Sequence, residues 1–289
     1  MNGVVAAVLS SALGGSAAAL TRYVIGATDP VTLAALRFGI GFVLILPLVI
    51  LLKSKWPRGR DWLWVALLGV LFFSIFFVFY NIAMSLTTAA RGSLALSCLP
   101  LTTMLVAVVF RKESFTSRKI LGVCVAIGGV SVALWTGLAD APPGAWRGDL
   151  IMAAATLCMA LYNVWSRPLM MRSSMFGFLA AGMGFGAAAS VLIAIQTGGF
   201  VHSFESFGLK QWLAAGCLGV FGGAAAFYLW VYALERTTPT RVANTMTVNP
   251  IAASLLAAVL VDEPLGANLL LGIAGVGGGI WLASTEGRK

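Results

Sequence analysis

The sequence predicts an all-α integral membrane protein, in which ten transmembrane helices form two inverted five-helix repeats around a central cavity. Of the 289 residues, 60% are hydrophobic and only 10% are charged, whereas soluble domains carry about 25% charged residues. The apolar residues form blocks close to the ~20 residues that a helix needs to cross a bilayer. In addition, one sequence pattern of the first half recurs in the second half.

Charged residues and helix breakers divide the apolar blocks into ten predicted spans. The first span is expected to be retained rather than cleaved as a signal peptide, because no Lys or Arg precedes it and its apolar run is long. No connection is long or polar enough for a soluble domain, and Pro and Gly are tolerated inside membrane helices. The spans are Gly3–Val24, Val31–Leu52, Trp62–Met84, Ala89–Phe110, Thr116–Thr136, Asp149–Met171, Ser174–Gln196, Lys210–Leu234, Pro239–Val261 and Leu265–Ser284.

The net charge of +9 is explained by membrane topology, and no nucleic-acid partner is expected. With an even number of spans both termini lie on one side, and 14 of the 19 Lys and Arg residues then share that side. Arg22, Arg91, Arg147 and Lys210 fall on the opposite side, and Arg37 lies inside the second span. Because cytoplasmic loops carry an excess of Lys and Arg, both termini are predicted to be cytoplasmic.

The stretches SLTTAARGSLALSCLP and ERTTPTRVANTMTVNP lie 150 residues apart and share Thr-Thr, Arg and Pro at the same spacing. An ungapped overlay of residues 83–130 on residues 233–280 gives 13 identities. Five spans are an odd number, so the second half enters the membrane inverted, as in many secondary transporters. We predict a first repeat at 1–138 and a second at 146–286. The pairs least expected by chance are Arg91/Arg241, Pro100/Pro250 and Glu113/Glu263.

The sequence offers no catalytic constellation, metal motif or cofactor fingerprint. Its four Cys lie within spans, their spacing matches no metal motif, and we expect them to be small buried apolar residues. Its single histidine, His202, lies in a predicted loop. No Asp or Glu lies at a span centre, where an ionisable residue would mark a proton relay. We take Lys and Arg to be lacking at span centres as well. That disfavours phosphorylated substrates and leaves neutral, zwitterionic or weakly polar ones.

Polar and aromatic residues inside the spans are the candidates for contacting a substrate. A cavity lined by aromatic rings with a few amide and hydroxyl groups suits an amino-acid side chain and its charged ends. Ser and Asn can also join helices by hydrogen bonds alone, so that alternative stays open for each of them. The candidate substrate-binding residues are Tyr80, Asn81, Ser93, Ser97, Tyr162, Asn163, Trp165, Tyr228, Trp230 and Asn244, and Asn249 shares their setting.

Two pairs of residues at equivalent positions of the repeats are candidates for flexing points and gates. Pro100 and Pro250 each free a backbone carbonyl and kink a helix; of a fixed kink and a flexing point, we favour the flexing point because both halves keep the proline. Tyr80 and Trp230 are equivalent at the same offset, and we predict them in an outer and an inner gate. The alternative is that both rings are interfacial anchors. Closer to the substrate we expect Tyr162, Asn163 and Asn244.

In each half, a span with a proline is followed by a Glu and then by a Gly-rich span, as in LPLTTMLVAVVFRKESFTSRKILGVCVAIGGV and NPIAASLLAAVLVDEPLGANLLLGIAGVGGG. With the ALRF of the second span, these residues resemble the ten-span EamA-type branch of the drug/metabolite transporter superfamily over essentially the whole chain. Around ALERTTPTRVANTMTVNP the chain looks most like the YddG-type aromatic amino-acid exporters. The resemblance implies a basket of ten helices around a central cavity. The ALRF arginine, Arg37, has no counterpart in the second half, where Met183 stands.

Together these features predict a secondary transporter that exports neutral, in particular aromatic, amino acids or similar small metabolites across the bacterial inner membrane by alternating access. The expected partners are a small-molecule substrate and the lipid bilayer, with no cofactor, and we expect a monomer. A broad exporter of small drugs is the alternative within transport. A membrane-embedded enzyme or a scaffold is the alternative from another class, and an enzyme would need catalytic groups that the sequence lacks. Facilitated diffusion and proton antiport both stay open.

Overall fold

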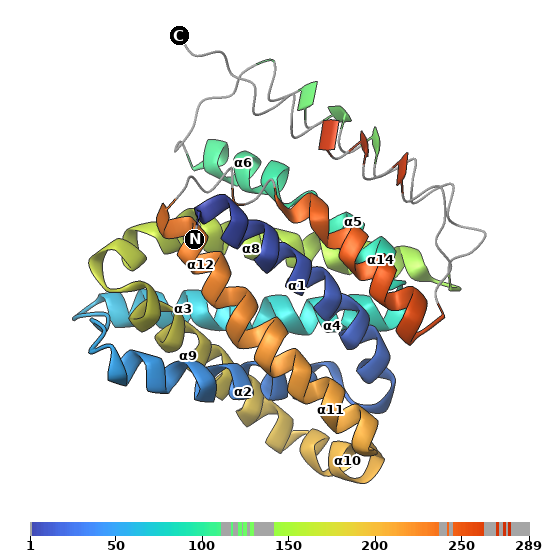
Figure 1. The fold of residues 1–289 in the computed structure, drawn as a ribbon, viewed down its shortest axis with the longest axis horizontal. Helices are drawn as coiled ribbons and strands as arrows, with labels where there is room; N and C mark the ends of the chain where they lie inside the picture. The colour runs from blue at the N-terminus through green and yellow to red at the C-terminus, as the bar shows by residue number, and fades with distance from the viewer. Residues whose placement is uncertain are drawn as a thin grey trace.

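The computed structural model describes residues 2–110, 142–236 and 245–262, together with single residues and short pairs elsewhere. The regular elements in these stretches are all helical (Figure 1). Several expectations fall outside the described residues. These are most of predicted spans five and ten, the start of span nine, and the candidate residue Asn244.

The described first half folds into four long helical spans, and two of these spans are interrupted. In the third span a π-helical segment, η2, interrupts the helix, and in the fourth a break at Ser97 and Cys98 separates two helices. The elements are α1 Gly3–Val24, η1 Ile25–Ala27, α2 Pro30–Leu51, α3 Asp61–Val70, η2 Leu71–Phe76, α4 Phe77–Leu86, α5 Ala89–Leu96 and α6 Leu99–Val109.

The described second half repeats this plan. The π-helical segment η3 interrupts the eighth predicted span at the place that η2 takes in the third, and the 3-10 segment η4 precedes α14 as the break at Ser97 precedes α6. The elements are α8 Ala145–Arg172, α9 Met175–Gln196, α10 Gly199–Ser206, α11 Leu209–Cys217, η3 Leu218–Ala225, α12 Ala226–Arg236, η4 Thr245–Thr247 and α14 Val248–Leu260.

Seven helices of the described residues are long and apolar enough to cross a membrane, and Thr245–Leu260 adds a shorter apolar helix. They correspond to predicted spans one to four and six to nine. The loop predicted around His202 is wrong, because these residues form α10. Gly198, with a φ of 72°, ends α9 and lets the chain turn into α10. The hydroxyl of Ser203 then anchors α10 to Thr28, with 2.6 Å between the two oxygens.

Local signals explain where the helices begin. The Asp29 carboxylate accepts hydrogen bonds from the backbone N–H of Val31 and Thr32, both at 2.9 Å, and Pro30 takes the first position of α2. Thr88 caps α5 and Ser174 caps α9 in the same manner. Such caps satisfy N–H groups that have no partner inside the helix.

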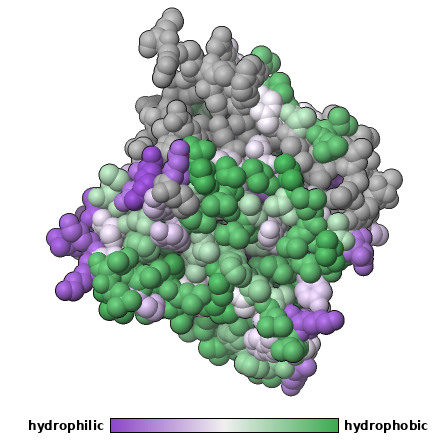
Figure 2. Space-filling model, in the orientation of Figure 1, coloured by the Kyte–Doolittle hydropathy of each residue, from purple (hydrophilic) through white to green (hydrophobic). Residues whose placement is uncertain are grey.

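The surface is apolar where a soluble protein would be polar. Large side chains such as Leu51 and Val259, each 77% exposed, point away from the protein. Figure 2 shows hydrophobic residues across the middle of the molecule, with hydrophilic residues gathered toward opposite edges. A band of this kind is covered by lipid tails in a bilayer, since exposed apolar patches of such size are rare on soluble monomers.

The halves interlock, because helices of the first pack chiefly on helices of the second. In Figure 1, α1 lies beside α12 and α14, and the contacts also join α2 to α9 and α4 to α8. Small residues permit the closest approaches. A Cβ added at Gly69 would lie 2.4 Å from the Gly182 carbonyl oxygen, so α3 and α9 touch backbone to backbone there. Small residues at such crossings are typical of membrane helix packing.

Candidate functional site

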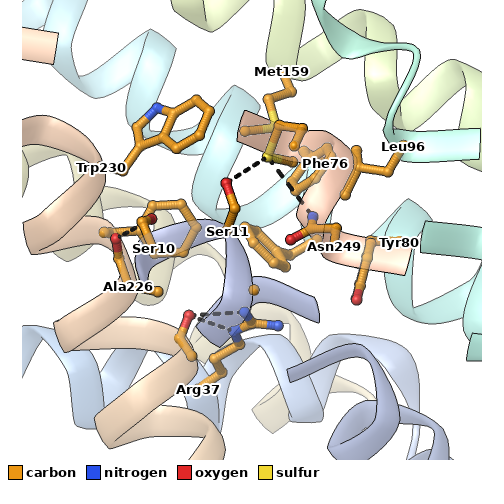
Figure 3. Close-up of a pocket in the computed structure, with 15 residues that line it drawn as sticks. Ser10, Ser11, Arg37, Phe76, Tyr80, Leu96, Met159, Ala226, Trp230 and Asn249 are labelled. Carbon is orange, nitrogen blue, oxygen red and sulfur yellow. Dashed lines mark hydrogen bonds between the residues drawn. The ribbon is translucent and has the colours of Figure 1, made fainter. Parts of the chain in front are cut away.

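A cavity of about 50 Å³ lies between the two halves. It has room for a few water molecules. Both halves contribute to its wall. The lining residues, most of which Figure 3 labels, are Ser10, Ser11, Gly14, Arg37, Phe76, Phe77, Tyr80, Leu96, Met159, Gly222, Ala226, Phe227, Trp230, Met246 and Asn249.

Aromatic rings form the largest part of the wall. Phe76, Phe77 and Tyr80 come from the junction of η2 and α4, where spacings of three and four residues bring side chains onto one face. Phe227 and Trp230 come from α12 with the same spacing. The Phe77 ring centroid lies 5.7 Å from that of Tyr80 and 5.8 Å from that of Phe227. The two halves therefore meet at the cavity through one cluster of rings.

The serine hydroxyls of α1 tie the first half to the second at the cavity. Ser10 Oγ donates to the Ala226 carbonyl at 2.7 Å. Ser11 Oγ lies 2.8 Å from Thr245 Oγ1. Both hydroxyls also face the cavity, so they can exchange these partners for a polar ligand group when the walls separate.

Three buried polar atoms of the lining have no hydrogen-bond partner among the described residues: Arg37 Nη1, Trp230 Nε1 and Asn249 Oδ1. Each such atom costs about 1–3 kcal/mol. Buried polar groups without a partner are rare and call for an explanation such as a bound ligand or water. The three atoms can therefore form hydrogen bonds to a polar molecule in the cavity.

The expectation that span centres lack Lys and Arg is wrong at Arg37. It lies inside α2, is 3% exposed, and lines the cavity. Its Nε and Nη2 donate to the Gly222 carbonyl at 3.2 and 2.8 Å. A Cβ at position 222 would lie 3.1 Å from Nη2, so only glycine leaves the guanidinium its full space. Gly222 of the π-helical segment η3 thus provides both the carbonyl that accepts from Arg37 and the space that the guanidinium occupies.

Of the ten candidate residues, Tyr80 and Trp230 line this cavity, and each is 3% exposed. Two of the candidates that do not line it, Asn81 and Ser97, bond to backbone carbonyls. Asn81 Nδ2 donates to the Pro30 carbonyl at 2.8 Å. Ser97 Oγ donates to the carbonyls of Ser93 and Met246, both at 2.9 Å. Ser93 itself is buried away from the cavity.

The candidates of α8 and α12 other than Trp230 do not line the cavity: three pack on other aromatic rings, and Asn163 is buried. Tyr162 stacks on Phe72 with 4.3 Å between ring centroids. Trp165 meets Phe110 edge to face at 4.5 Å, and Tyr228 stacks on Phe176 at 5.4 Å. Asn163 is 6% exposed, and its Oδ1 has no partner among the described residues.

The two prolines lie at the helix breaks. Pro100 is at the start of α6, directly after the break at Ser97 and Cys98, and Pro250 is in the first turn of α14, after η4. The hydrogen bond from Ser97 Oγ to the Met246 carbonyl joins the two breaks across the halves. No group of three or more His, Cys, Asp or Glu that could hold a metal ion occurs in the part of the chain described.

Sequence reasoning missed the contribution of α1 and of Phe76, Phe77 and Phe227, and it underrated Arg37. The signal for Arg37 was available, because an ionisable residue inside a span is a functional candidate by default. Ser10 and Ser11 carry no comparable signal, since serine is common at membrane helix contacts.

The sequence model of the EamA-like transporter family matches residues 1–135 and 146–285. A protein of Streptantibioticus cattleyicolor, named a probable terminal-alkyne amino-acid exporter, is 28% identical over 81% of this chain and 80% of its own. An uncharacterized transporter of Archaeoglobus fulgidus is 25% identical over 87% of each chain. The inner membrane transporter YedA of Escherichia coli, also uncharacterized, is 24% identical over 87% of this chain and 80% of its own.

The fold is also that of a protein of known crystal structure. That structure is 24% identical and aligns with a TM-score of 0.69 over 98% of this chain and 99% of its own. The agreement over both chains extends the likeness to the whole helical assembly.

Proposed function

Because the chain belongs to the EamA-like transporter family, we propose that this transporter exports neutral, in particular aromatic, amino acids or similar small metabolites across the bacterial inner membrane by alternating access. Family membership makes the chain a transporter and not an enzyme. The substrate, the direction and the mechanism are the proposed part. The amino-acid exporter among the relatives supports the substrate class.

The observation that carries the proposal is the cavity between the halves, with its ring of aromatic side chains and its three unpartnered polar atoms. Rings such as Phe77, Phe227 and Trp230 offer apolar surface for an aromatic side chain. Arg37 Nη1, Trp230 Nε1 and Asn249 Oδ1 offer two donors and one acceptor for the charged ends of an amino acid. A hydrocarbon-like drug would leave these atoms unsatisfied.

Alternating access follows from two halves that share one site. We propose repeats at 1–138 and 146–286, inverted relative to one another, with both termini in the cytoplasm. Tyr80 from the first half and Trp230 from the second would then close the cavity toward opposite sides. In secondary transporters of this architecture, one repeat rocks against the other around a site near the membrane midplane.

The experiment is flux of radiolabelled phenylalanine from proteoliposomes that contain the purified protein, with protein-free liposomes as the control. Lysine and ethidium are the comparison substrates. We expect phenylalanine flux well above the control, with lysine at the level of protein-free liposomes. Ethidium flux without phenylalanine flux would instead support the broad drug exporter. Repeating the assay with and without a pH gradient separates facilitated diffusion from proton antiport.

A further inference from the structure

We propose that Arg37 is the residue that binds the carboxylate of the transported molecule, so that the cavity takes small aromatic carboxylates rather than amines. An aromatic α-amino acid is the expected member of that class. The inference rests on the proposed function in one respect, namely that the cavity is the transport site.

The hydrogen bonds of Arg37 to the Gly222 carbonyl leave one edge of its guanidinium without a backbone partner, and the Tyr80 hydroxyl lies close to the same guanidinium. Nε and Nη2 both donate to the single carbonyl oxygen of Gly222. Nη1 is buried and has no partner among the described residues. A guanidinium binds a carboxylate through two parallel N–H bonds, and the edge formed by Nη1 and the second N–H of Nη2 has that geometry. Gly222 thus holds the side chain in place without using the edge that suits a ligand.

The positive charge of Arg37 has no counter-ion in the described part of the chain. The ion pairs found there involve Arg91, Arg172 and Arg236, and none of the described Asp or Glu side chains pairs with Arg37. The rings of Phe77 and Phe38, with centroids 4.6 and 5.5 Å from Cζ, compensate part of the charge. A buried cation without an anion is strongly unfavourable, so a ligand that brings a carboxylate is favoured over one that brings an ammonium alone.

The remaining lining suits the rest of such a molecule. Figure 3 shows Arg37 on one side of the cavity and Trp230 on the opposite side, with Asn249 beside Tyr80, and aromatic rings form part of the lining. Asn249 Oδ1 is a free acceptor, which can take a hydrogen bond from an α-ammonium group. An aromatic amino acid therefore meets a donor edge, an acceptor and apolar rings in one cavity.

The test measures binding to purified protein in nanodiscs, using phenylalanine, 3-phenylpropionate and phenethylamine. The last two lack the ammonium and the carboxylate, respectively. In the wild type we expect both carboxylates to bind at least tenfold more tightly than phenethylamine. Arg37→Met, which removes the charge and keeps an unbranched side chain, should abolish this preference. Arg37→Lys should keep part of it, because a lysine keeps the charge but not the planar fork.

Arg172→Gln is the matched control, because Arg172 forms an exposed ion pair with Asp61 outside the cavity; it should keep the full preference. Arg37→Gln, which retains a donor for the Gly222 carbonyl, replaces Arg37→Met if that variant does not fold. Equal binding of phenylalanine and phenethylamine in the wild type, or an unchanged preference in the Arg37 variants, would overturn the role of Arg37 while leaving amino-acid export intact. Binding of 3-phenylpropionate without phenylalanine would support Arg37 and overturn amino-acid export.

Discussion

Arg91 Nη2 lies 2.6 Å from Asp149 Oδ2, and this ion pair joins the start of α5 in the first half to the start of α8 in the second. The two side chains are 8% and 12% exposed, and Thr87 Oγ1 donates to the other carboxylate oxygen at 3.2 Å. The pair therefore fastens the halves to each other at one end of the molecule.

Removing the carboxylate should loosen this contact. Asp149→Asn removes the carboxylate that pairs with Arg91, and breaking a buried pair from one side costs about 3–5 kcal/mol. We expect a clearly lower melting temperature in detergent. Asp61→Asn is the matched control, because its ion pair with Arg172 is more exposed and such pairs contribute ~0–1 kcal/mol. Equal melting of the two variants would show that the Arg91–Asp149 pair does not stabilise the assembly.

The sequence was sufficient for the membrane class and for the existence of the eight described spans, because these depend on composition and on spacing along the chain, but it did not indicate α10 or the breaks inside three of the spans. It was insufficient for the cavity wall, because that depends on contacts across the halves. Arg37 bonds to Gly222 within the π-helical segment η3, and nothing in LGVFGGAA indicates a π-helical turn. Tyr162 and Trp165 have the composition expected of a binding site, but they pack on Phe72 and Phe110 instead.

The orientation in the membrane is testable at two exposed positions. Arg58 lies in the loop between α2 and α3, and Trp146, at 55% exposure, lies in the first turn of α8. In a background without native cysteines, we expect an impermeant thiol reagent to label Trp146→Cys in intact cells, and to label Arg58→Cys only after lysis. The reverse pattern would place the termini outside the cytoplasm.

The prolines at the helix breaks should affect the rate of transport more than the affinity. The double variant Pro100→Ala/Pro250→Ala lets both helices continue, so the halves should rock more slowly. We expect turnover to fall about tenfold, which is ~1.4 kcal/mol in the barrier, with little change in phenylalanine binding. Pro47→Ala, at an exposed proline inside α2, is the control. Unchanged turnover in the double variant would leave the prolines as fixed kinks.

Shortening either gate ring should produce a one-sided leak. With Ala226→Cys as a reporter in the cavity wall, Tyr80→Ala should increase labelling from outside and Trp230→Ala labelling from inside. The physical reason is that each ring excludes water from the cavity on its own side. Trp62→Ala removes a ring that stacks on Trp56 outside the cavity, and it should change neither. If both gate variants label like the parent and still transport, the gates lie elsewhere.

The most direct test of the proposed transport site is whether the substrate slows thiol labelling of a cysteine in the cavity. Ala226→Cys, in proteoliposomes of known orientation and with the gate rings intact, is exposed to an impermeant thiol reagent from one side and then from the other, with and without phenylalanine. If the cavity is the shared site of both conformations, the cysteine reacts from either side and phenylalanine slows both reactions, while lysine slows neither. Labelling from one side only, or labelling that phenylalanine leaves unchanged while phenylalanine flux is normal, would contradict the assignment of this cavity as the transport site.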